Sequence, residues 1–372
     1  SELASTKKIL IGAQGFDNGM LMLANMNIPS TDSTYLSLAG NAVLTLGPGA
    51  TFAGDVVADA GGICLSGATF NSSAIITKNG TSNDRGAGRN LFNGPTSIIN
   101  TGTGYLLMCN NYPDTFNTEV TFSSMNSGLI YPCYNGSGSV FNENIIVNST
   151  VGGGVRIGAS SGTSTIANTK RVIVGSEGFD AGTLILGNFT SEDTSSFALS
   201  LSGSSTLTLG PNSSFAGDFT ADAGGFFLNG VTMNKSSSFT KTGTTNDQGT
   251  GSNIFNGPTS FVNEGTGYFL MCSSQNDIFN DEVTFSSKNS GIIYSAYRGT
   301  GTQFNDNIII NSTSTGGVRI GASTGTSVLA AGKQIIVGSD GFSSGTLILG
   351  NFTSASTTEQ VIDLTGSAVL TL

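Results

Sequence analysis

The sequence predicts an all-β fold, a right-handed single-stranded parallel β-helix, from a long repeat, a shorter repeat inside it, and alternating apolar residues. The long repeat is 163 residues without insertion or deletion, so that residues 8–12 correspond to residues 171–175 and to residues 334–338. Self-similarity at a fixed period is typical of solenoid proteins, whose modules stack on one another.

This repeat divides the 372-residue chain into two complete modules and the start of a third. The modules are residues 1–163, 164–326 and 327–372. Because no gap separates them, we expect one continuous rod. The pattern begins and ends within a module, so we also expect a piece of a longer array.

A shorter repeat of about 24 residues lies inside each module and is marked by Phe-Asn pairs. In the first module the pairs are Phe92-Asn93, Phe116-Asn117 and Phe141-Asn142, and in the second Phe255-Asn256, Phe279-Asn280 and Phe304-Asn305. At this spacing each 163-residue repeat forms about seven coils, and each coil adds roughly 4.8 Å to a rod.

Short segments of alternating apolar residues lie between these markers, for example residues 184–186 and 206–209. They are β-branched and aromatic and are separated by Gly, Asn and Ser, which indicates strands and turns. Parallel crossover connections are right-handed in nearly all proteins, which predicts the hand of the helix.

The repeat also predicts what fills the interior and the corners of each coil. We expect Phe to stack on Phe inside the tube, and the Asn that follows to adopt the left-handed backbone conformation and to bond from coil to coil. Twelve residues after each Phe stands a glycine, and we expect these glycines to make turns with positive φ. They are Gly104, Gly128 and Gly153.

Composition excludes several classes of partner. Charged residues make up 10% of the chain and the net charge is −10, which argues against nucleic-acid binding because that needs clustered Lys and Arg. No apolar stretch approaches the roughly 20 residues of a membrane span, so we expect no membrane insertion.

The four cysteines do not form the framework of a disulfide-rich domain. Cys64 and Cys133 are replaced by Phe227 and Ala296 in the second module, and a bridge that held the module together would not be replaced in this way. We expect free thiols, although Cys109 and Cys133 occupy the same position in adjacent coils.

Acidic residues occur as repeated copies, whereas an active site occurs once. Asp55, Asp84 and Asp114, for example, recur as Asp218, Asp247 and Asp277. We therefore expect no enzyme, no catalytic residue and no cofactor. The Asn-Asp loops around Asp84 and Asp247 resemble oxygen-rich calcium loops, and these two residues are candidate calcium ligands.

A second candidate site is an outward column fifteen residues after each Phe. If the residues on either side point inward, these side chains point outward and are exposed. The column consists of Leu107, Tyr131, Arg156, Leu270, Tyr294 and Arg319. Tyr131, Arg156, Tyr294 and Arg319 are candidate contacts for a glycan, because tyrosine rings and guanidinium groups suit sugar rings and their hydroxyls.

The texture of the repeats resembles a known family over essentially the whole chain. Residues 92–108 (FNGPTSIINTGTGYLLM), 277–291, 304–323 and 335–353 (IIVGSDGFSSGTLILGNFT) are similar to the repeat arrays of giant Bacteroidetes cell-surface adhesins of the gliding-motility type. This resemblance implies export by type IX secretion and display as a filament on the outer membrane.

The predicted function is therefore that of a structural stalk segment of an extracellular filamentous adhesin, for surface adhesion and gliding motility. Its partners would be neighbouring repeats of the same chain and surface polysaccharides, and the piece itself would be monomeric. The alternative is a carbohydrate-binding or polysaccharide-degrading β-helix protein.

Overall fold

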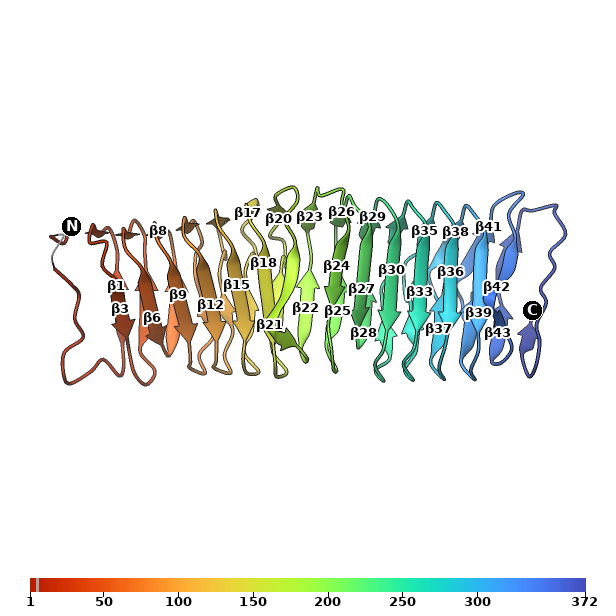
Figure 1. Cartoon of the computed structure of the whole chain (residues 1–372), viewed down its shortest axis with the longest axis horizontal. Helices are drawn as coiled ribbons and strands as arrows, with labels where there is room; N and C mark the ends of the chain where they lie inside the picture. Colours follow the sequence, from red (N-terminus) through yellow and green to blue (C-terminus); the bar gives the residue numbers. More distant parts are fainter. Residues whose placement is uncertain (5–6) are drawn as a thin grey trace. The chain divides into compact units, whose positions relative to one another are not determined.

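The computed structural model describes residues 1–4 and 7–372, and over these residues the chain consists of β-strands, turns and loops with no helix (Figure 1). Within that part of the chain there is accordingly no helix long and apolar enough to cross a membrane. The fold is a parallel β-solenoid of about 15 turns. The all-β parallel solenoid expected from the sequence is confirmed. The chain divides into two compact units, Ser1–Ser191 (unit 1) and Glu192–Leu372 (unit 2).

In unit 1 each turn contributes short strands to three faces. Except at one step of the third face, each strand pairs in parallel with its counterpart in the next turn. The first face contains β2 (Asn27–Ile28), β5 (Thr51–Phe52), β8 (Thr69–Phe70), β11 (Leu91–Phe92), β14 (Thr115–Phe116), β17 (Ser139–Phe141), β20 (Ser164–Ile166) and β23 (Phe189–Ser191). The second contains β3 (Thr34–Ser37), β6 (Val56–Ala60), β9 (Ala74–Lys78), β12 (Thr96–Asn100), β15 (Val120–Ser124), β18 (Ile145–Ser149) and β21 (Val172–Phe179). The third contains β1 (Met20–Leu23), β4 (Val43–Leu46), β7 (Gly62–Leu65), β10 (Asp84–Arg85), β13 (Leu106–Leu107), β16 (Leu129–Tyr131), β19 (Gly154–Ile157) and β22 (Thr183–Leu186).

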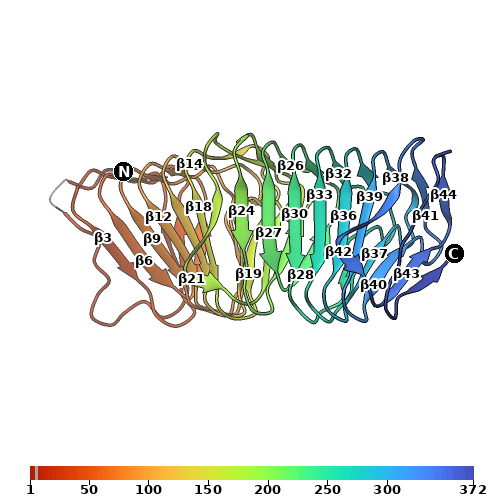
Figure 2. The ribbon, with the colours of Figure 1, turned by 45° about the vertical axis from the view of Figure 1, so that its right-hand side comes forward.

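Unit 2 has the same three kinds of face, and Figure 2 shows β24, β27, β30, β33 and β36 side by side. The first face contains β26 (Ser213–Phe215), β29 (Val231–Met233), β32 (Ile254–Phe255), β35 (Ile278–Phe279), β38 (Thr300–Phe304), β41 (Thr326–Leu329) and β44 (Phe352–Ser354). The second contains β24 (Phe197–Ser200), β27 (Phe219–Ala223), β30 (Ser237–Lys241), β33 (Thr259–Asn263), β36 (Val283–Ser287), β39 (Ile308–Ser312) and β42 (Ile335–Phe342). The third contains β25 (Thr206–Leu209), β28 (Gly225–Leu228), β31 (Asp247–Gln248), β34 (Phe269–Leu270), β37 (Ile292–Ser295), β40 (Gly317–Ile320), β43 (Thr346–Leu349) and β45 (Val369–Thr371).

A column of buried phenylalanine rings runs through the interior of each unit. In unit 1 the ring centroids of successive turns are 4.6 to 5.4 Å apart and the ring planes are nearly parallel. The rings belong to Phe52, Phe70, Phe92, Phe116 and Phe141. Unit 2 repeats the arrangement with Phe255, Phe279 and Phe304. The expected stacking of Phe on Phe is confirmed.

The asparagine after each of these phenylalanines forms a second column, on the outside. Asn117 donates its side-chain amide to the oxygen of Asn93 at 2.7 Å and accepts from Asn142 at 2.7 Å. The coil-to-coil bonding is confirmed, and it recurs at Asn256, Asn280 and Asn305. The expected left-handed backbone is wrong, because these residues are not among those with positive φ. These asparagines therefore form the amide ladder with an ordinary, right-handed or extended backbone.

The glycines twelve residues after each Phe serve a different purpose from the one expected. Gly104, Gly128 and Gly153 have no positive φ. A Cβ at Gly104 would instead collide with the carbonyl oxygen of Ser82 in the preceding turn, and one at Gly153 with the hydroxyl of Ser124. Turns approach each other too closely here for any side chain.

The phenylalanine column generates a prediction for stability. Phe116→Ala removes one fully buried ring from the middle of the unit 1 stack, and we expect it to lower the free energy of unfolding by about 3–5 kcal/mol. The control is Thr115→Ala on the same strand, whose side chain is only half-buried and should change stability by less than about 0.5 kcal/mol. Because the chain has no Trp, denaturant unfolding is followed by far-ultraviolet circular dichroism. Equal losses in the two variants would contradict a core built on stacked rings.

Candidate functional site

The predicted tyrosine and arginine column is present in both units. In unit 2, Tyr294 on β37 and Arg319 on β40 are register partners in adjacent turns. The Arg319 guanidinium donates to the Tyr294 hydroxyl at 3.0 Å, and its central carbon lies 5.2 Å from the centre of the tyrosine ring. In unit 1, Arg156 bonds the hydroxyl of Tyr131 at 3.4 Å, with 5.7 Å between carbon and ring centre. The structure thus brings these four residues together as two pairs.

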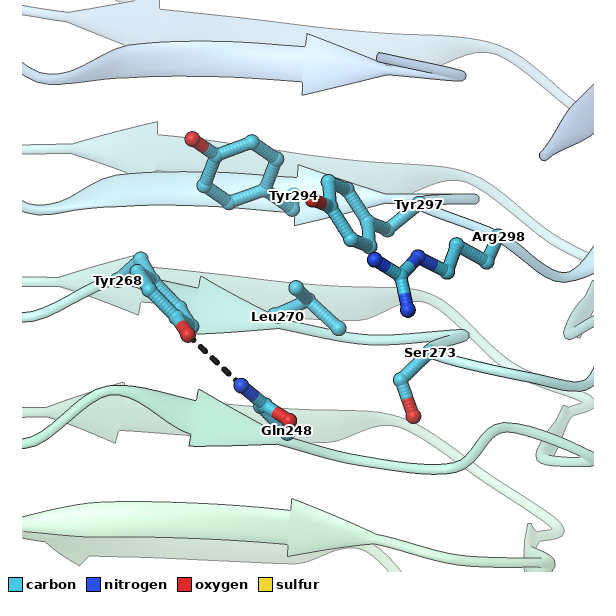
Figure 3. A pocket seen from close by; sticks show the side chains of 7 residues that line it. All are labelled: Gln248, Tyr268, Leu270, Ser273, Tyr294, Tyr297 and Arg298. Atoms are coloured by element: carbon cyan, nitrogen blue, oxygen red, sulfur yellow. Dashed lines mark hydrogen bonds between the residues drawn. The ribbon is translucent and has the colours of Figure 1, made fainter. Parts of the chain in front are cut away.

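The expectation that the column is exposed along its length is wrong at Leu107 and Leu270. Their side chains are 3% and 4% exposed. Figure 3 shows the reason for Leu270, which lies among the side chains of Tyr268, Tyr294 and Tyr297. Large aromatic side chains from neighbouring positions therefore cover the small apolar side chain and shield it from water.

Two further tyrosines in each unit extend the column into a tyrosine cluster. In unit 1 the Tyr131 ring meets the rings of Tyr105 and Tyr134 edge to face, at 5.8 and 5.4 Å between centroids. In unit 2, Tyr268, Tyr294 and Tyr297 repeat this geometry at 5.7 and 5.3 Å. The two tyrosine clusters hold six of the eight tyrosines of the chain, so this side chain is concentrated at one place in each unit.

Sequence reasoning missed these additional tyrosines for two different reasons. Tyr105 and Tyr268 precede Leu107 and Leu270 by two residues, so strand alternation places them on the same face and could have identified them. Tyr134 and Tyr297 lie just beyond the ends of β16 and β37. Outside a strand, alternation no longer gives the direction of a side chain.

The tyrosine cluster of unit 2 surrounds a cavity of about 150 Å³ (Figure 3). Its walls are the three tyrosines and Leu270, and polar groups stand at its edge. These polar residues are Gln248, Ser273 and Arg298. Gln248 donates to the hydroxyl of Tyr268 at 2.9 Å, and the Arg298 guanidinium lies 5.4 Å from the centre of the Tyr297 ring. Aromatic walls with a few polar groups at the rim suit a small polar ligand.

The two candidate calcium ligands lie in a different environment from the one expected. Asp84 and Asp247 are buried on the two-residue strands β10 and β31. A buried lysine ammonium faces each carboxylate, Lys78 at 3.5 Å and Lys241 at 3.3 Å. The carboxylates also accept backbone hydrogen bonds from the preceding turn, from Ile63 at 3.0 Å and from Phe226 at 2.7 Å.

These contacts give the two aspartates a structural role within the solenoid. Burial lowers the pKa of both lysines, and burial raises the pKa of Asp247 to about 6. In the described part of the chain, no group of three or more His, Cys, Asp or Glu side chains is placed to hold a metal ion. Calcium binding at Asp84 and Asp247 stays a prediction from the sequence. In the structure the cation beside each carboxylate is the ammonium group of a lysine, Lys78 or Lys241.

Two other repeated acids are completely buried in polar clusters. One oxygen of Asp114 accepts hydrogen bonds from the backbone and side-chain N–H groups of Asn90, at 2.8 and 2.9 Å. Asp277 is bonded in the same way by Asn253. The second oxygen of each carboxyl has no hydrogen-bond partner among the described residues. Burial raises the pKa of both groups to about 6.

Half-buried acids also link neighbouring turns. Asp55 accepts hydrogen bonds from the hydroxyls of Ser72 and Ser73 at 2.6 and 2.7 Å, and these bonds lower its pKa. Asp218 makes the equivalent bond to Ser236 at 2.6 Å. The repeated acids, whether buried or half-buried, thus join neighbouring turns through hydrogen bonds.

Comparison of this chain with protein-family models, with curated proteins and with solved structures found no match. The candidate site therefore rests on the geometry of the tyrosine clusters.

The buried carboxyls predict a pH dependence of stability. Their folded-state pKa of about 6 lies above the ordinary 3.8, so the folded state holds these protons more tightly than the unfolded state. The stabilisation is complete below about pH 4 and is lost as the pH rises through 6. Each group contributes up to about 3 kcal/mol to this loss.

The test compares the wild type with the double variant Asp114→Asn/Asp277→Asn, which cannot ionise at these positions. Denaturant unfolding is measured at pH 4.5 and 7.5. We expect the free energy of unfolding to fall more in the wild type than in the variant over this interval. An identical fall in both would show that the two aspartates do not titrate in the folded protein.

The cysteines lead to a separate prediction. All four are unpaired in the structure, and Cys109, Cys133 and Cys272 are buried. Thiol titration of unfolded, unreduced protein should give four free groups. Cys133→Ala should give three and fold normally, because Ala296 occupies the corresponding buried position. A count below four in the wild type would reveal a bridge.

Proposed function

We propose that this chain is a structural stalk segment of an extracellular filamentous adhesin. In this proposal the solenoid is right-handed, has about seven coils per 163-residue repeat, and continues through the modules as one rod. Its role is to hold an adhesive part of the molecule at a distance from the cell surface.

The observation that carries the proposal is that the same contacts recur in turn after turn. The phenylalanine column and the asparagine ladder both join each turn only to its immediate neighbours. The stability of such a molecule is approximately a sum of nearest-neighbour terms. Modules can therefore be added without any new interaction, which suits a protein whose useful property is length.

The coil number has support within unit 1. Seven strand-to-strand steps lead from β2 to β23 on the first face. Asn27 in β2 and Thr190 in β23 are 163 residues apart in the sequence. The right-handed sense rests on the strong preference of parallel crossover connections for that hand.

The extracellular setting rests on the resemblance of the repeats to giant Bacteroidetes cell-surface adhesins, which implies type IX secretion and gliding motility. A net charge of −10 is compatible with a soluble filament that avoids lateral association. In this proposal the chain is monomeric, its partners are neighbouring repeats and surface polysaccharides, and it has no enzymatic activity.

The proposal predicts how length depends on the number of modules. Small-angle X-ray scattering is measured for the present chain and for tandem proteins with one and two additional 163-residue modules. We expect the maximum dimension to rise by about 35 Å per module, at seven spacings of roughly 4.8 Å, with an unchanged cross-section. A smaller increment, a wider cross-section, or release of reducing sugar from any polysaccharide would contradict a passive stalk.

A further inference from the structure

We propose that the cavity in the tyrosine cluster of unit 2 binds an acidic sugar, a single pyranose ring that carries a carboxylate. This inference rests on the proposed function in one respect, because surface polysaccharides are among the partners proposed for the stalk, and it names the kind of sugar that the chain would bind. It rests on the walls of the cavity, the cation at its rim, and the differences between the two units.

The walls of the cavity suit a sugar ring. Tyr268, Tyr294 and Tyr297 are half-buried and meet edge to face, so that ring faces and edges both border the space. A pyranose has an apolar C–H face that packs on an aromatic ring, while its hydroxyls extend to the side. Leu270 adds an apolar surface that water scarcely reaches.

The size of the cavity limits the ligand to one ring. Its volume of about 150 Å³ is below the roughly 300–1,000 Å³ of pockets that hold drug-sized molecules. One sugar unit of a longer chain would enter, and the neighbouring units would remain outside against the solenoid surface.

Arg298 supplies the preference for an acid. Its guanidinium is exposed beside Tyr297, and the described residues offer this side chain no hydrogen bond and no ion pair. The Tyr297 hydroxyl and the Ser273 hydroxyl likewise have no hydrogen-bond partner in the part of the chain that the structure describes. A carboxylate could accept two parallel hydrogen bonds from the guanidinium, and sugar hydroxyls could pair with the two protein hydroxyls.

The tyrosine cluster of unit 1 keeps the rings and changes the polar rim. Arg85 stands in the place of Gln248, and Asn135 in the place of Arg298. The Arg85 side chain is already engaged, because it donates to the Tyr105 hydroxyl at 2.9 Å. Unit 1 therefore offers no unpaired guanidinium where Arg298 stands in unit 2, and we expect the acid to bind in unit 2.

This natural difference supplies a variant that the fold accepts. Arg298→Asn introduces the residue that unit 1 has at the same position. The matched control is Arg89→Ser, which removes the same charge from a residue that belongs to neither tyrosine cluster and lies over the ring of Tyr112 at 3.6 Å. It introduces the residue of the second module, Ser252. Arg89 and Ser252 also share a φ of 63°, so the backbone needs no change.

The experiment is calorimetric titration of the 372-residue chain with trigalacturonate, its methyl ester and sodium acetate at low ionic strength. We expect trigalacturonate to bind with a stoichiometry of one. The methyl ester and the Arg298→Asn variant should each show binding weaker by roughly tenfold, the effect of losing a charge-assisted hydrogen bond. Arg89→Ser should bind as the wild type does. Tyr297→Phe, which keeps the ring, should weaken binding less than Arg298→Asn.

Four results would overturn the inference. These are no binding of trigalacturonate, equal affinity for the acid and its ester, unchanged affinity in Arg298→Asn, and acetate binding as tightly as the sugar acid. The last would identify a site for small anions only. Circular dichroism of each variant verifies that the solenoid is intact, so that a loss of binding reports on the cavity.

Discussion

The parallel backbone ladder between successive turns is the interaction on which the rest of this structure depends. Each strand pairs in register with the strand one turn away, as Thr96–Asn100 does with Val120–Ser124. A spacing of roughly 4.8 Å then places equivalent side chains directly over one another. Phenylalanine rings can stack at that distance, and asparagine amides can bond at it. Glycine is required wherever the path of one turn comes too close to the next, as at Gly104.

The same constraint explains why charged groups can lie inside so narrow a fold. A buried carboxylate is costly unless it is paired or hydrogen-bonded. Asp84 meets this condition through Lys78 and a backbone N–H of the preceding turn. Asp114 meets it through two hydrogen bonds from one residue of the turn before it, donated by the backbone N–H and the side-chain amide of Asn90. Each aspartate thus bonds to one specific residue of the neighbouring turn. Such contacts favour the observed strand register over registers shifted by one or more residues.

On the outside, the ladder brings together side chains that are far apart in sequence. Tyr268 and Tyr294 lie in adjacent turns, and their rings meet because β34 and β37 are paired. The paired strands fix the positions of the tyrosines. Substitutions of the polar residues at the edge of the cavity can therefore change which ligand it suits without disturbing the fold. Arg298 and Asn135 illustrate this, since they occupy the same position beside equivalent rings in the two units.

The sequence by itself determined the class of fold, the phenylalanine column, the asparagine ladder and the place of Tyr131 and Arg156 in one column, because a fixed period puts equal positions of successive turns in contact. It did not determine the backbone at Asn93 and Gly104, nor the partner of Asp84 or the place of Tyr134. These depend on how the chain turns between strands and past their ends. Periodicity carries no information there, because corner geometry is set by the close approach of neighbouring turns, which only the tertiary structure defines.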